Sequence, residues 1–243
     1  MRNQWLPLWL SFFLLFQYPS SAKHHPSCPP SSCGKILNIT YPFRLKGDPR
    51  GCGLSRYELD CVNKVTVLTM FSGKYHVQEI NYKKYQIRLT DAGIVEDACS
   101  VPRYFLYPGN FSYFKIPYYS TPDALTFRDM WPVDEISYPS IAFLNCSNAV
   151  TNDPRYVEMD THRCDSGGHI YAILILDYFD FSLKDVKVGC HLQVSTFADL
   201  MKPIKKWNGD SFEVDFVENV NGASADDIRK WLNSGFWLSW LTP

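Results

Sequence analysis

Eight cysteines, all between residues 28 and 190, set the strongest limit on the fold of this 243-residue chain. An even set of cysteines in an oxidising compartment predicts disulfide bonds, here four. A structural zinc site is the alternative, but it needs closely paired ligands and the chain has no Cys-x-x-Cys pair. We therefore expect no metal and no other cofactor. The cysteines are Cys28, Cys33, Cys52, Cys61, Cys99, Cys146, Cys164 and Cys190.

Eight cysteines allow 105 pairings, so the sequence does not give the connectivity. We expect one bond between Cys146 and Cys164, which enclose a polar segment of seventeen residues. In the chain-entropy model a loop of that size stabilises the fold by about 3 kcal/mol.

The first 22 residues are predicted to be a secretory signal peptide. Arg2 gives a positive start, residues 5–16 are apolar, and Ser20, Ser21 and Ala22 offer small residues for cleavage. A membrane anchor is the alternative, but this apolar stretch has 12 residues, and a span needs about 20. We expect a secreted product without a membrane span, located in the cell wall or at the outer face of the plasma membrane. Three glycosylation sequons agree with export, at Asn38, Asn110 and Asn145.

Charge divides the remaining chain into two parts. Residues 23–91 hold eleven Lys or Arg against five Asp or Glu, whereas residues 92–243 carry a net charge of −8. Such asymmetry indicates two modules, the first of which attracts anions. Ordinary solvated surface, with the two halves attracting each other, is an equal alternative. The overall charge of −1 argues against nucleic-acid binding.

Strand patterns dominate the chain. The β-branched stretch 64–71, the stretch 75–80 and the alternating stretch 85–90 predict a three-stranded antiparallel meander. Tyr85, Ile87 and Leu89 would face the core, with Gln86 and Arg88 on the solvent face. Further strands are expected at 141–144, 169–176, 186–188, 190–194 and 212–217.

One helix is expected after Ser224, which caps it, with Asp227 three residues later and Gly235 at its end. A shorter helix near 197–206 is interrupted by Pro203. The predicted fold class is mainly β with one or two short helices, a β-rich α+β arrangement in a disulfide-stapled ectodomain of two modules.

Residues 102–140 contain six prolines among many aromatic residues, which predicts a connector of irregular structure. Its aromatic side chains are expected to seal the seam between two modules, and a sugar-stacking platform is the alternative. The predicted organisation is a signal peptide over 1–22, a cysteine-rich module over 23–101, the connector over 102–140 and a second β-rich module over 141–243.

Several motifs carry a family resemblance. The order Cys28-x4-Cys33-Gly34, Tyr41-Pro42-Phe43, Cys52-Gly53 and Leu59-Asp60-Cys61 resembles the galacturonan-binding domain of plant wall-associated receptor kinases. Later motifs resemble ectodomains of leaf-rust-resistance-type receptor-like kinases. These motifs are Phe143-Leu144-Asn145-Cys146-Ser147, Val188-Gly189-Cys190 and Gly235-Phe236-Trp237-Leu238-Ser239-Trp240.

The resemblance implies a non-catalytic extracellular module that binds pectin, the polygalacturonate of the plant cell wall, with a protein co-receptor as a further partner. The family's cysteine-rich tail, membrane span and kinase would follow the last motif, so we expect either a fragment of a receptor kinase or a secreted relative. Similar ectodomains also precede RING-type ubiquitin ligases.

Polyuronate recognition needs cations for carboxylates and aromatic rings for sugar faces. The first module supplies both, with Tyr41, Tyr82 and Tyr85 near its basic residues. The candidate ligand-binding residues are Lys35, Arg44, Lys46, Arg50, Arg56, Tyr57, Lys83, Lys84 and Arg88. Single exposed ion pairs contribute about 0–1 kcal/mol, so we expect weak binding that is sensitive to salt.

Two other function classes stay open. A protein- or peptide-sensing ectodomain would use the aromatic stretch 102–119 and the acidic second half. A secreted hydrolase has less support, because the protease-like segment 164–168 lacks a catalytic histidine motif and the acids Asp177, Asp180 and Asp185 form no recognisable pair.

Overall fold

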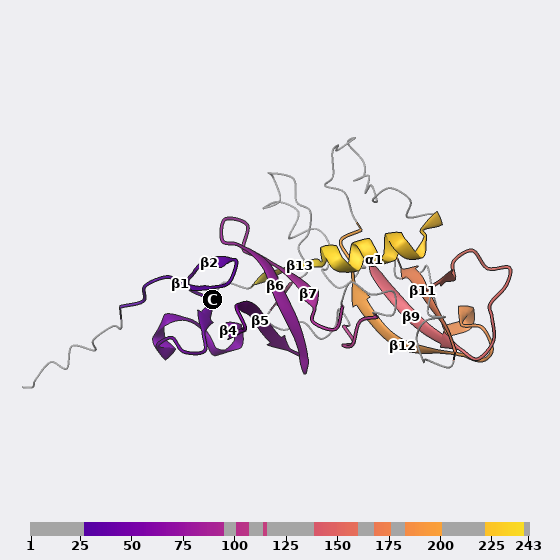
Figure 1. Ribbon diagram of the computed structural model, residues 1–243, viewed down its shortest axis with the longest axis horizontal. Helices are drawn as coiled ribbons and strands as arrows, with labels where there is room; N and C mark the ends of the chain where they lie inside the picture. The colour runs from indigo at the N-terminus through magenta and orange to yellow at the C-terminus, as the bar shows by residue number, and fades with distance from the viewer. Residues whose placement is uncertain are drawn as a thin grey trace, which may run out of the picture.

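The computed structural model describes residues 27–94, 101–106, 114–115, 139–159, 168–175, 183–200 and 222–240. Two β-sheets of seven and four strands and a separate two-stranded hairpin make up the fold, with one α-helix in the described ranges. Figure 1 shows the strands of the N-terminal part at one end of the molecule and β9, β11 and β12 at the other, with α1 and β13 between them. The predicted β-rich, disulfide-stapled fold class is confirmed.

The larger sheet is built mainly from the N-terminal part of the chain, in the order β3-β4-β5-β6-β7-β13-β8. Strands β4 to β7 follow one another as an antiparallel meander, and β3 adds a short parallel edge. Its strands are β3 (Arg44–Leu45), β4 (Glu58–Val62), β5 (Val65–Met70), β6 (Gly73–Asn81), β7 (Gln86–Asp91), β8 (Phe114–Lys115) and β13 (Phe236–Trp240).

The predicted three-stranded meander is confirmed as β5, β6 and β7. Ile87 and Leu89 face the core as predicted. The prediction that Tyr85 faces the core is wrong. Tyr85 precedes β7 with a positive φ of 56° and is 52% exposed. A left-handed residue cannot continue the pleat, so the alternation of strand β7 begins only at Gln86.

The predicted C-terminal helix is confirmed as α1 (Ala225–Ser234). The Ser224 hydroxyl accepts a hydrogen bond from the Asp227 amide, and the Asp227 carboxylate accepts one from the Ser224 amide, which together form a capping box. Gly235 ends the helix with a positive φ of 79° and turns the chain directly into β13.

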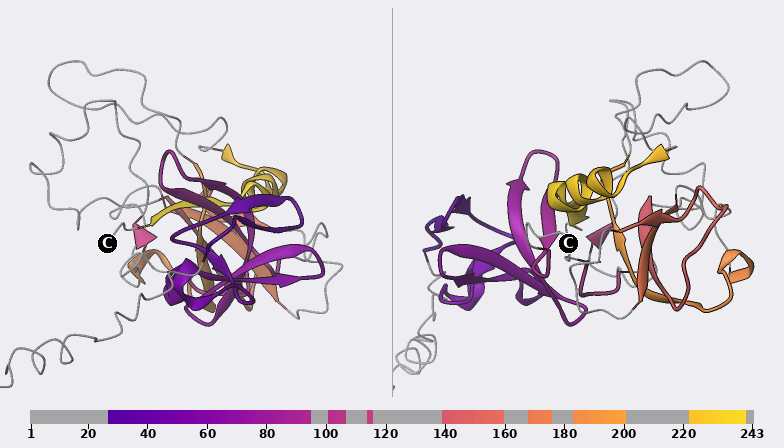
Figure 2. Two further views of the ribbon diagram at one scale, coloured as in Figure 1. Left: turned by 90° about the vertical axis from the view of Figure 1, so that its left-hand side faces the viewer. Right: turned by 45° about the vertical axis from the view of Figure 1, so that its right-hand side comes forward.

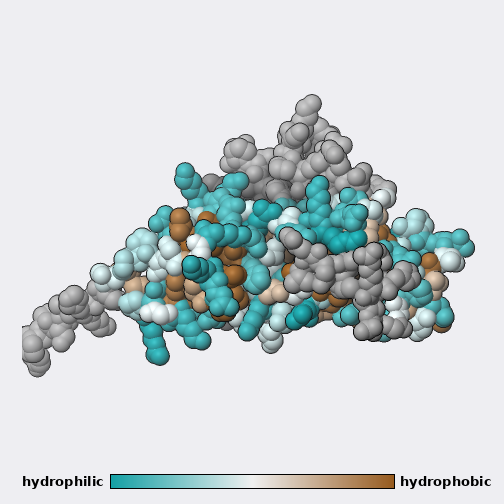
Figure 3. Space-filling view, viewed as in Figure 1, coloured by the Kyte–Doolittle hydropathy of each residue, from teal (hydrophilic) through white to brown (hydrophobic). Residues whose placement is uncertain are grey.

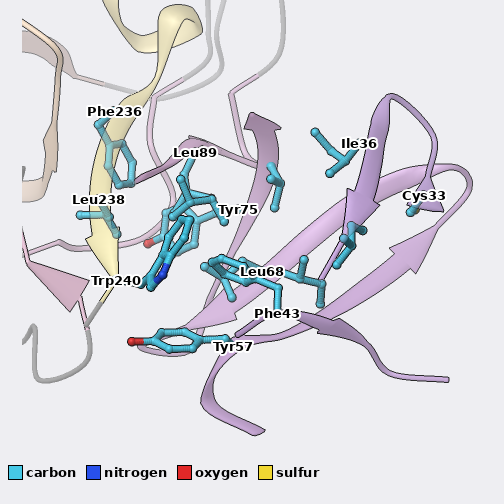
Figure 4. Packing of buried hydrophobic residues seen from close by; sticks show 14 of the residues in the cluster. Cys33, Ile36, Phe43, Tyr57, Leu68, Tyr75, Leu89, Phe236, Leu238 and Trp240 are labelled. Carbon is cyan, nitrogen blue, oxygen red and sulfur yellow. The ribbon is translucent and has the colours of Figure 1, made fainter. Parts of the chain in front are cut away.

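The helix and the strand after it join the two cores. Ile228, Trp231 and Leu232 of α1 belong to the apolar cluster under the smaller sheet. Phe236 and Trp240 of β13 belong to the cluster of the larger sheet (Figure 4). In the right-hand view of Figure 2, the helix lies beside the larger sheet at one end and reaches over the smaller sheet at the other.

The smaller sheet has the order β10-β11-β9-β12 and runs antiparallel throughout. Three of the strands predicted for the second half are confirmed in it. Its strands are β9 (Ser140–Cys146), β10 (Val157–Glu158), β11 (His169–Ile175) and β12 (Cys190–Phe197).

Two predictions in this region are wrong. Residues 186–188 form a bend and turn between the short helix η6 (Leu183–Asp185) and β12, and Val188 is 101% exposed. The helix expected at 197–206 is absent from its described part, since Phe197 ends β12 and 198–200 are irregular. Phe197 packs 5.7 Å from Phe236 between ring centroids, and this core contact favours an extended chain over a helix.

Three disulfides lie within the described residues, which confirms the expected use of these six cysteines and leaves them no thiolate for zinc. They are Cys28–Cys52, Cys33–Cys61 and Cys146–Cys190. The expected Cys146–Cys164 bond is therefore wrong. Cys146 and Cys190 face each other in the β9–β12 register with their Cα atoms 3.9 Å apart, so strand pairing decides their partnership.

The described start of the connector lies in the seam between the sheets. The buried Asp91 carboxylate accepts hydrogen bonds from the amides of Gly93, Arg103 and Tyr104. Leu106 then packs in the larger core while its amide donates to Ser195 of β12. Most aromatic residues of the connector lie outside the described residues, so the aromatic seal between two modules remains a prediction.

The division of the chain at residues 101 and 141 remains a prediction. Strand β13 belongs to the predicted second module but pairs with β7 of the first. The signal peptide, most of the connector and the expected strand at 212–217 lie outside the described residues. Cys99 and Cys164 also lie outside them. Within the described ranges, no helix combines the length and apolar character that a membrane span requires.

Candidate functional site

Two turns at one end of the larger sheet present lysines to solvent. Strands β4 and β6 run in the same direction, because each is antiparallel to β5 between them. The turns that follow β4 and β6 therefore lie at the same end of the sheet. One turn contains Lys64 and the other contains Lys83 and Lys84, and all three side chains are exposed. We call the group of Lys35, Lys64, Lys83 and Lys84 the basic end of the sheet.

Lys35 belongs to this end because its hairpin packs against the first of the two turns. It lies between β1 (Ser31–Cys33) and β2 (Ile36–Ile39). A Cβ atom added to Gly34 would lie 1.8 Å from the Lys64 carbonyl oxygen, so only glycine allows this approach. The Lys35 ammonium donates to the Gln78 side chain of β6, and the Cys33–Cys61 disulfide fixes the hairpin to β4.

The sequence counted Lys64 among the basic residues of the module but did not place it in the candidate site. The sequence does not show that Lys64 lies next to Lys35, because this follows from the packing of Gly34 against the β4–β5 turn in the folded chain. Among the described residues, no carboxylate pairs with Lys64, Lys83 or Lys84. Within the described residues, ion pairs therefore do not neutralise the charges of these three lysines.

A second group of predicted residues lies before the start of β4 and along the β3 edge of the sheet. Arg50 and Arg56 belong to the short helices η2 (Arg50–Cys52) and η3 (Ser55–Tyr57), and both are exposed. The Arg56 guanidinium lies 5.2 Å from the centroid of the Tyr57 ring. Lys46 is 72% exposed, and its ammonium lies 3.7 Å from Asp60. The structure thus separates these three residues from the basic end of the sheet.

Arg44 and Tyr57 do not reach the surface, which corrects their assignment as ligand-binding residues. The Arg44 side chain is 8% exposed and forms an ion pair with Glu58. Tyr57 is fully buried, and its ring packs 5.5 Å from Phe43. Arg44 therefore belongs to the edge strand β3, and Tyr57 belongs to the core of the larger sheet.

Arg88 is half-buried and holds the C-terminal segment. Its Nε donates to the Ser234 carbonyl oxygen at 2.6 Å, and its guanidinium lies 5.8 Å from the Trp237 ring centroid. A cation at the C-terminal end of α1 also complements the helix dipole. Arg88 therefore joins β7 to α1 and β13 rather than extending into solvent.

Figure 3 shows apolar residues at the surface of the N-terminal lobe, framed by hydrophilic ones. The exposed apolar and aromatic side chains of this lobe include Leu37, Tyr41, Val62, Val65, Phe71 and Tyr85. Tyr41 and Tyr85 adjoin the turn that carries Lys83 and Lys84. The basic end thus combines cations with aromatic rings.

The two described sequons differ in environment. Asn38 is exposed at the end of the β1–β2 hairpin. Asn145 is half-buried in the central strand β9, opposite Ile170 on one side and His191 on the other. Asn110 lies outside the described residues, and glycosylation at all three remains a prediction.

Among the residues considered as catalytic groups of a hydrolase, Asp185 lies within the described ranges and the others lie outside them. Asp185 accepts a hydrogen bond from Arg155 at 3.0 Å. Asp177, Asp180 and residues 164–167 lie outside the described ranges. Asp153, 8% exposed, binds Arg155 and Lys187, and these hydrogen bonds hold the pKa of its carboxyl far below the usual range. This cluster fixes the loop between β9 and β10.

Comparison with known protein families gives a match over the segment that contains the basic end of the sheet. Residues 28–91 match the family described as wall-associated receptor kinase galacturonan-binding. This range begins at Cys28, ends with β7 and contains the whole basic end. The match confirms the resemblance found in the cysteine framework.

Curated plant proteins are similar over more of the chain. A leaf rust 10 disease-resistance locus receptor-like protein kinase-like 2.5 of Arabidopsis thaliana is 30% identical over 61% of this chain and 22% of its own length. The like 1.2 protein of the same plant is 26% identical over 53% of this chain and 18% of its own. The RING-H2 finger protein ATL21A of Arabidopsis thaliana is 28% identical over 93% of this chain and 56% of its own.

The chain thus spans between 18% and 56% of the length of these relatives. No solved structure matches it significantly.

Proposed function

We propose that this chain is a non-catalytic extracellular module that binds acidic cell-wall polysaccharide, of the polygalacturonate type, through the basic end of its larger sheet. The observation that carries the proposal is the gathering of Lys35, Lys64, Lys83 and Lys84 inside the segment that matches a galacturonan-binding family. A polyuronate bears one carboxylate on each sugar, so several lysines on one surface can bind successive sugars of one chain.

The disulfides support export, since such bonds persist in oxidising compartments. They also hold the lysines in place before ligand arrives. The Cys33–Cys61 bond and the contact of Gly34 with Lys64 keep two turns together, which lowers the entropy lost on binding.

The binding should be weak for each contact and stronger for a long polymer. An exposed ion pair contributes about 0–1 kcal/mol, and repeated contacts along one polymer increase the total through multivalency. Screening acts over about 8 Å at physiological ionic strength and about 3 Å in molar salt. Raising the salt concentration should therefore weaken the complex steeply.

The test uses the full exported chain with its disulfides formed. Binding to polygalacturonate is measured by calorimetry or pull-down at low and half-molar salt, beside binding to the methyl-esterified polymer. The variant Lys83→Ala/Lys84→Ala should weaken binding and flatten its salt dependence. Lys74→Ala is the matched control, since Lys74 is exposed on the same sheet at the opposite end, beside Thr69.

Equal binding to the esterified polymer, or binding that half-molar salt leaves unchanged, would contradict the electrostatic mechanism. Binding to a protein partner with no binding to polygalacturonate would favour the protein-sensing alternative. An equal loss in the Lys74→Ala control would show that the effect belongs to net charge and not to the basic end.

A further inference from the structure

We propose that Tyr41 and Tyr85 form a platform on which sugar rings of the acidic polysaccharide stack, while Lys83 and Lys84 beside it bind the carboxylates. This inference rests on the proposed function and deepens it, because it assigns affinity that does not depend on charge. The platform lies where the β6–β7 turn meets the C-terminal strand β13.

Tyr85 is fixed from below and open above. Its carbonyl oxygen accepts a hydrogen bond from the Trp240 amide at 3.1 Å, and its ring lies 6.0 Å from the Trp240 ring at an angle of 77°. Trp240 is 4% exposed, whereas Tyr85 is 52% exposed. The Trp240 ring thus supports Tyr85 from the core, and the left-handed backbone directs the tyrosine away from the strand.

Tyr82 locks the segment carrying Tyr41 to the same turn. Its hydroxyl accepts a hydrogen bond from the Thr40 amide at 2.8 Å and donates one to the Thr40 carbonyl oxygen at 3.0 Å. Its ring packs 5.7 Å from Trp240, edge to face. Tyr41 is the next residue after Thr40 and is 51% exposed. Two exposed rings are therefore carried by segments that are held together before ligand binds.

A uronate sugar matches this surface in two ways. Its ring has an apolar face of C–H groups, which an aromatic ring can cover while the tyrosine hydroxyl stays in water. Its carboxylate needs a cation, and Lys83 and Lys84 are exposed beside Tyr82 and Tyr85 in the same turn. The turn is ordered by the Lys84 amide, which donates to the Asn81 side chain at 3.1 Å.

The test compares aromatic and basic variants of the full disulfide-bonded chain, with polygalacturonate as the probe. Tyr85→Ala and Tyr41→Ala should each weaken binding about five- to tenfold, the effect expected for one aromatic contact. The loss should be the same at low and high salt, since stacking is not screened. Tyr85→Phe keeps the ring and should bind like the unchanged protein.

Phe71→Ala is the matched control, because Phe71 is an aromatic residue, 40% exposed, in the β5–β6 turn at the opposite end of the sheet. Thermal unfolding of each variant checks that the fold is retained. Unchanged binding by Tyr85→Ala and Tyr41→Ala, together with a loss in Lys83→Ala/Lys84→Ala, would overturn the platform and leave the proposed function standing. An unchanged protein that does not bind polygalacturonate would overturn both.

Discussion

Arg44 and Glu58 form an ion pair across the parallel β3–β4 pair, where the two residues face each other in register. The Arg44 side chain is 8% exposed and that of Glu58 is 30% exposed. Arg44 also donates to the carbonyl oxygens of Leu45 and Asp48, at 3.5 and 3.4 Å. The pair therefore fixes the edge of the larger sheet, and its arginine serves the fold rather than a ligand.

Replacing Arg44 should reduce stability without changing affinity. Arg44→Gln leaves the Glu58 carboxylate without its cation and should cost about 2 kcal/mol, less than the 3–5 kcal/mol of a fully buried pair because Glu58 is partly hydrated. Denaturant unfolding measures the loss. Arg44→Met/Glu58→Leu should recover most of the stability, since both charges are removed together. A stable Arg44→Gln variant with weakened polygalacturonate binding would return Arg44 to the binding site.

Tyr75 should make the fold sensitive to alkali. Its ring is fully buried, its hydroxyl has no partner among the described residues, and burial together with the nearby Asp91 raises its pKa above the ordinary value of 10.0. A raised pKa means that the folded state disfavours the ionised form, so stability is complete below pH 10 and falls as the pH rises further. Tyr75→Phe removes the ionisation and the unpaired hydroxyl.

The Tyr75→Phe variant should be equal to or up to about 1 kcal/mol more stable than the original at neutral pH. Unfolding curves measured from neutral pH to above pH 10 should diverge in favour of the variant. Tyr85→Phe is the control, because it removes an exposed tyrosine hydroxyl from the same part of the chain and leaves the buried Tyr75 in place. A parallel alkaline loss in Tyr75→Phe would contradict this account.

Trp240 should be essential to the N-terminal sheet although it lies near the end of the chain. The centroid of its ring lies 4.9 Å from that of the Phe43 ring and 5.7 Å from that of the Tyr82 ring. Trp240→Ala should cost about 3–5 kcal/mol, as for other large-to-small core changes. Trp237→Ala is the control, since Trp237 is half-buried on the other side of β13. Equal stabilities of the two variants would contradict this role for Trp240.

The same contacts predict that residues 27–94 do not fold stably alone. Without β13, the edge of β7 and the apolar faces of Phe43 and Tyr75 would be open to water. Amide exchange should show low protection in the isolated segment and high protection in the full chain. High protection of β7 in the isolated segment would show that β13 is dispensable.

Mapping the disulfides tests the largest correction to the sequence prediction. Digestion without reduction should yield a peptide pair that joins Cys146 to Cys190. Cys190→Ala should leave a free thiol at the buried Cys146, which a thiol reagent labels once the protein is unfolded, and should loosen the β9–β12 pair. Recovery of a Cys146–Cys164 peptide pair instead would contradict the register of the smaller sheet.

The predictions that succeeded depend on neighbours in the chain. The meander around β6 follows from alternation over a few residues, and α1 follows from Ser224, Asp227 and Gly235 at fixed spacings. The predictions from sequence were wrong where the position of a residue depends on a contact with a distant part of the chain. Tyr85 fits an alternating pattern, yet it lies before the strand with a positive φ, and its ring packs on Trp240, more than 150 residues away.

The candidate site shows the same division. The sequence identified a basic segment and its tyrosines from composition and spacing. It did not separate Lys83, which reaches solvent, from Arg44 and Tyr57, which are buried, because burial depends on which strands pack over them.

By itself, the sequence determined the β-rich class, the use of cysteines in disulfides and the positive charge of the first module, since these depend on residue types and short-range order. Only the tertiary structure decided that Cys146 bonds to Cys190, that Lys64 joins Lys35, and that β13 completes the N-terminal sheet. Those three outcomes are contacts between segments far apart in the chain. Strand register and core packing select such contacts, and many pairings of segments would satisfy the local pattern equally well.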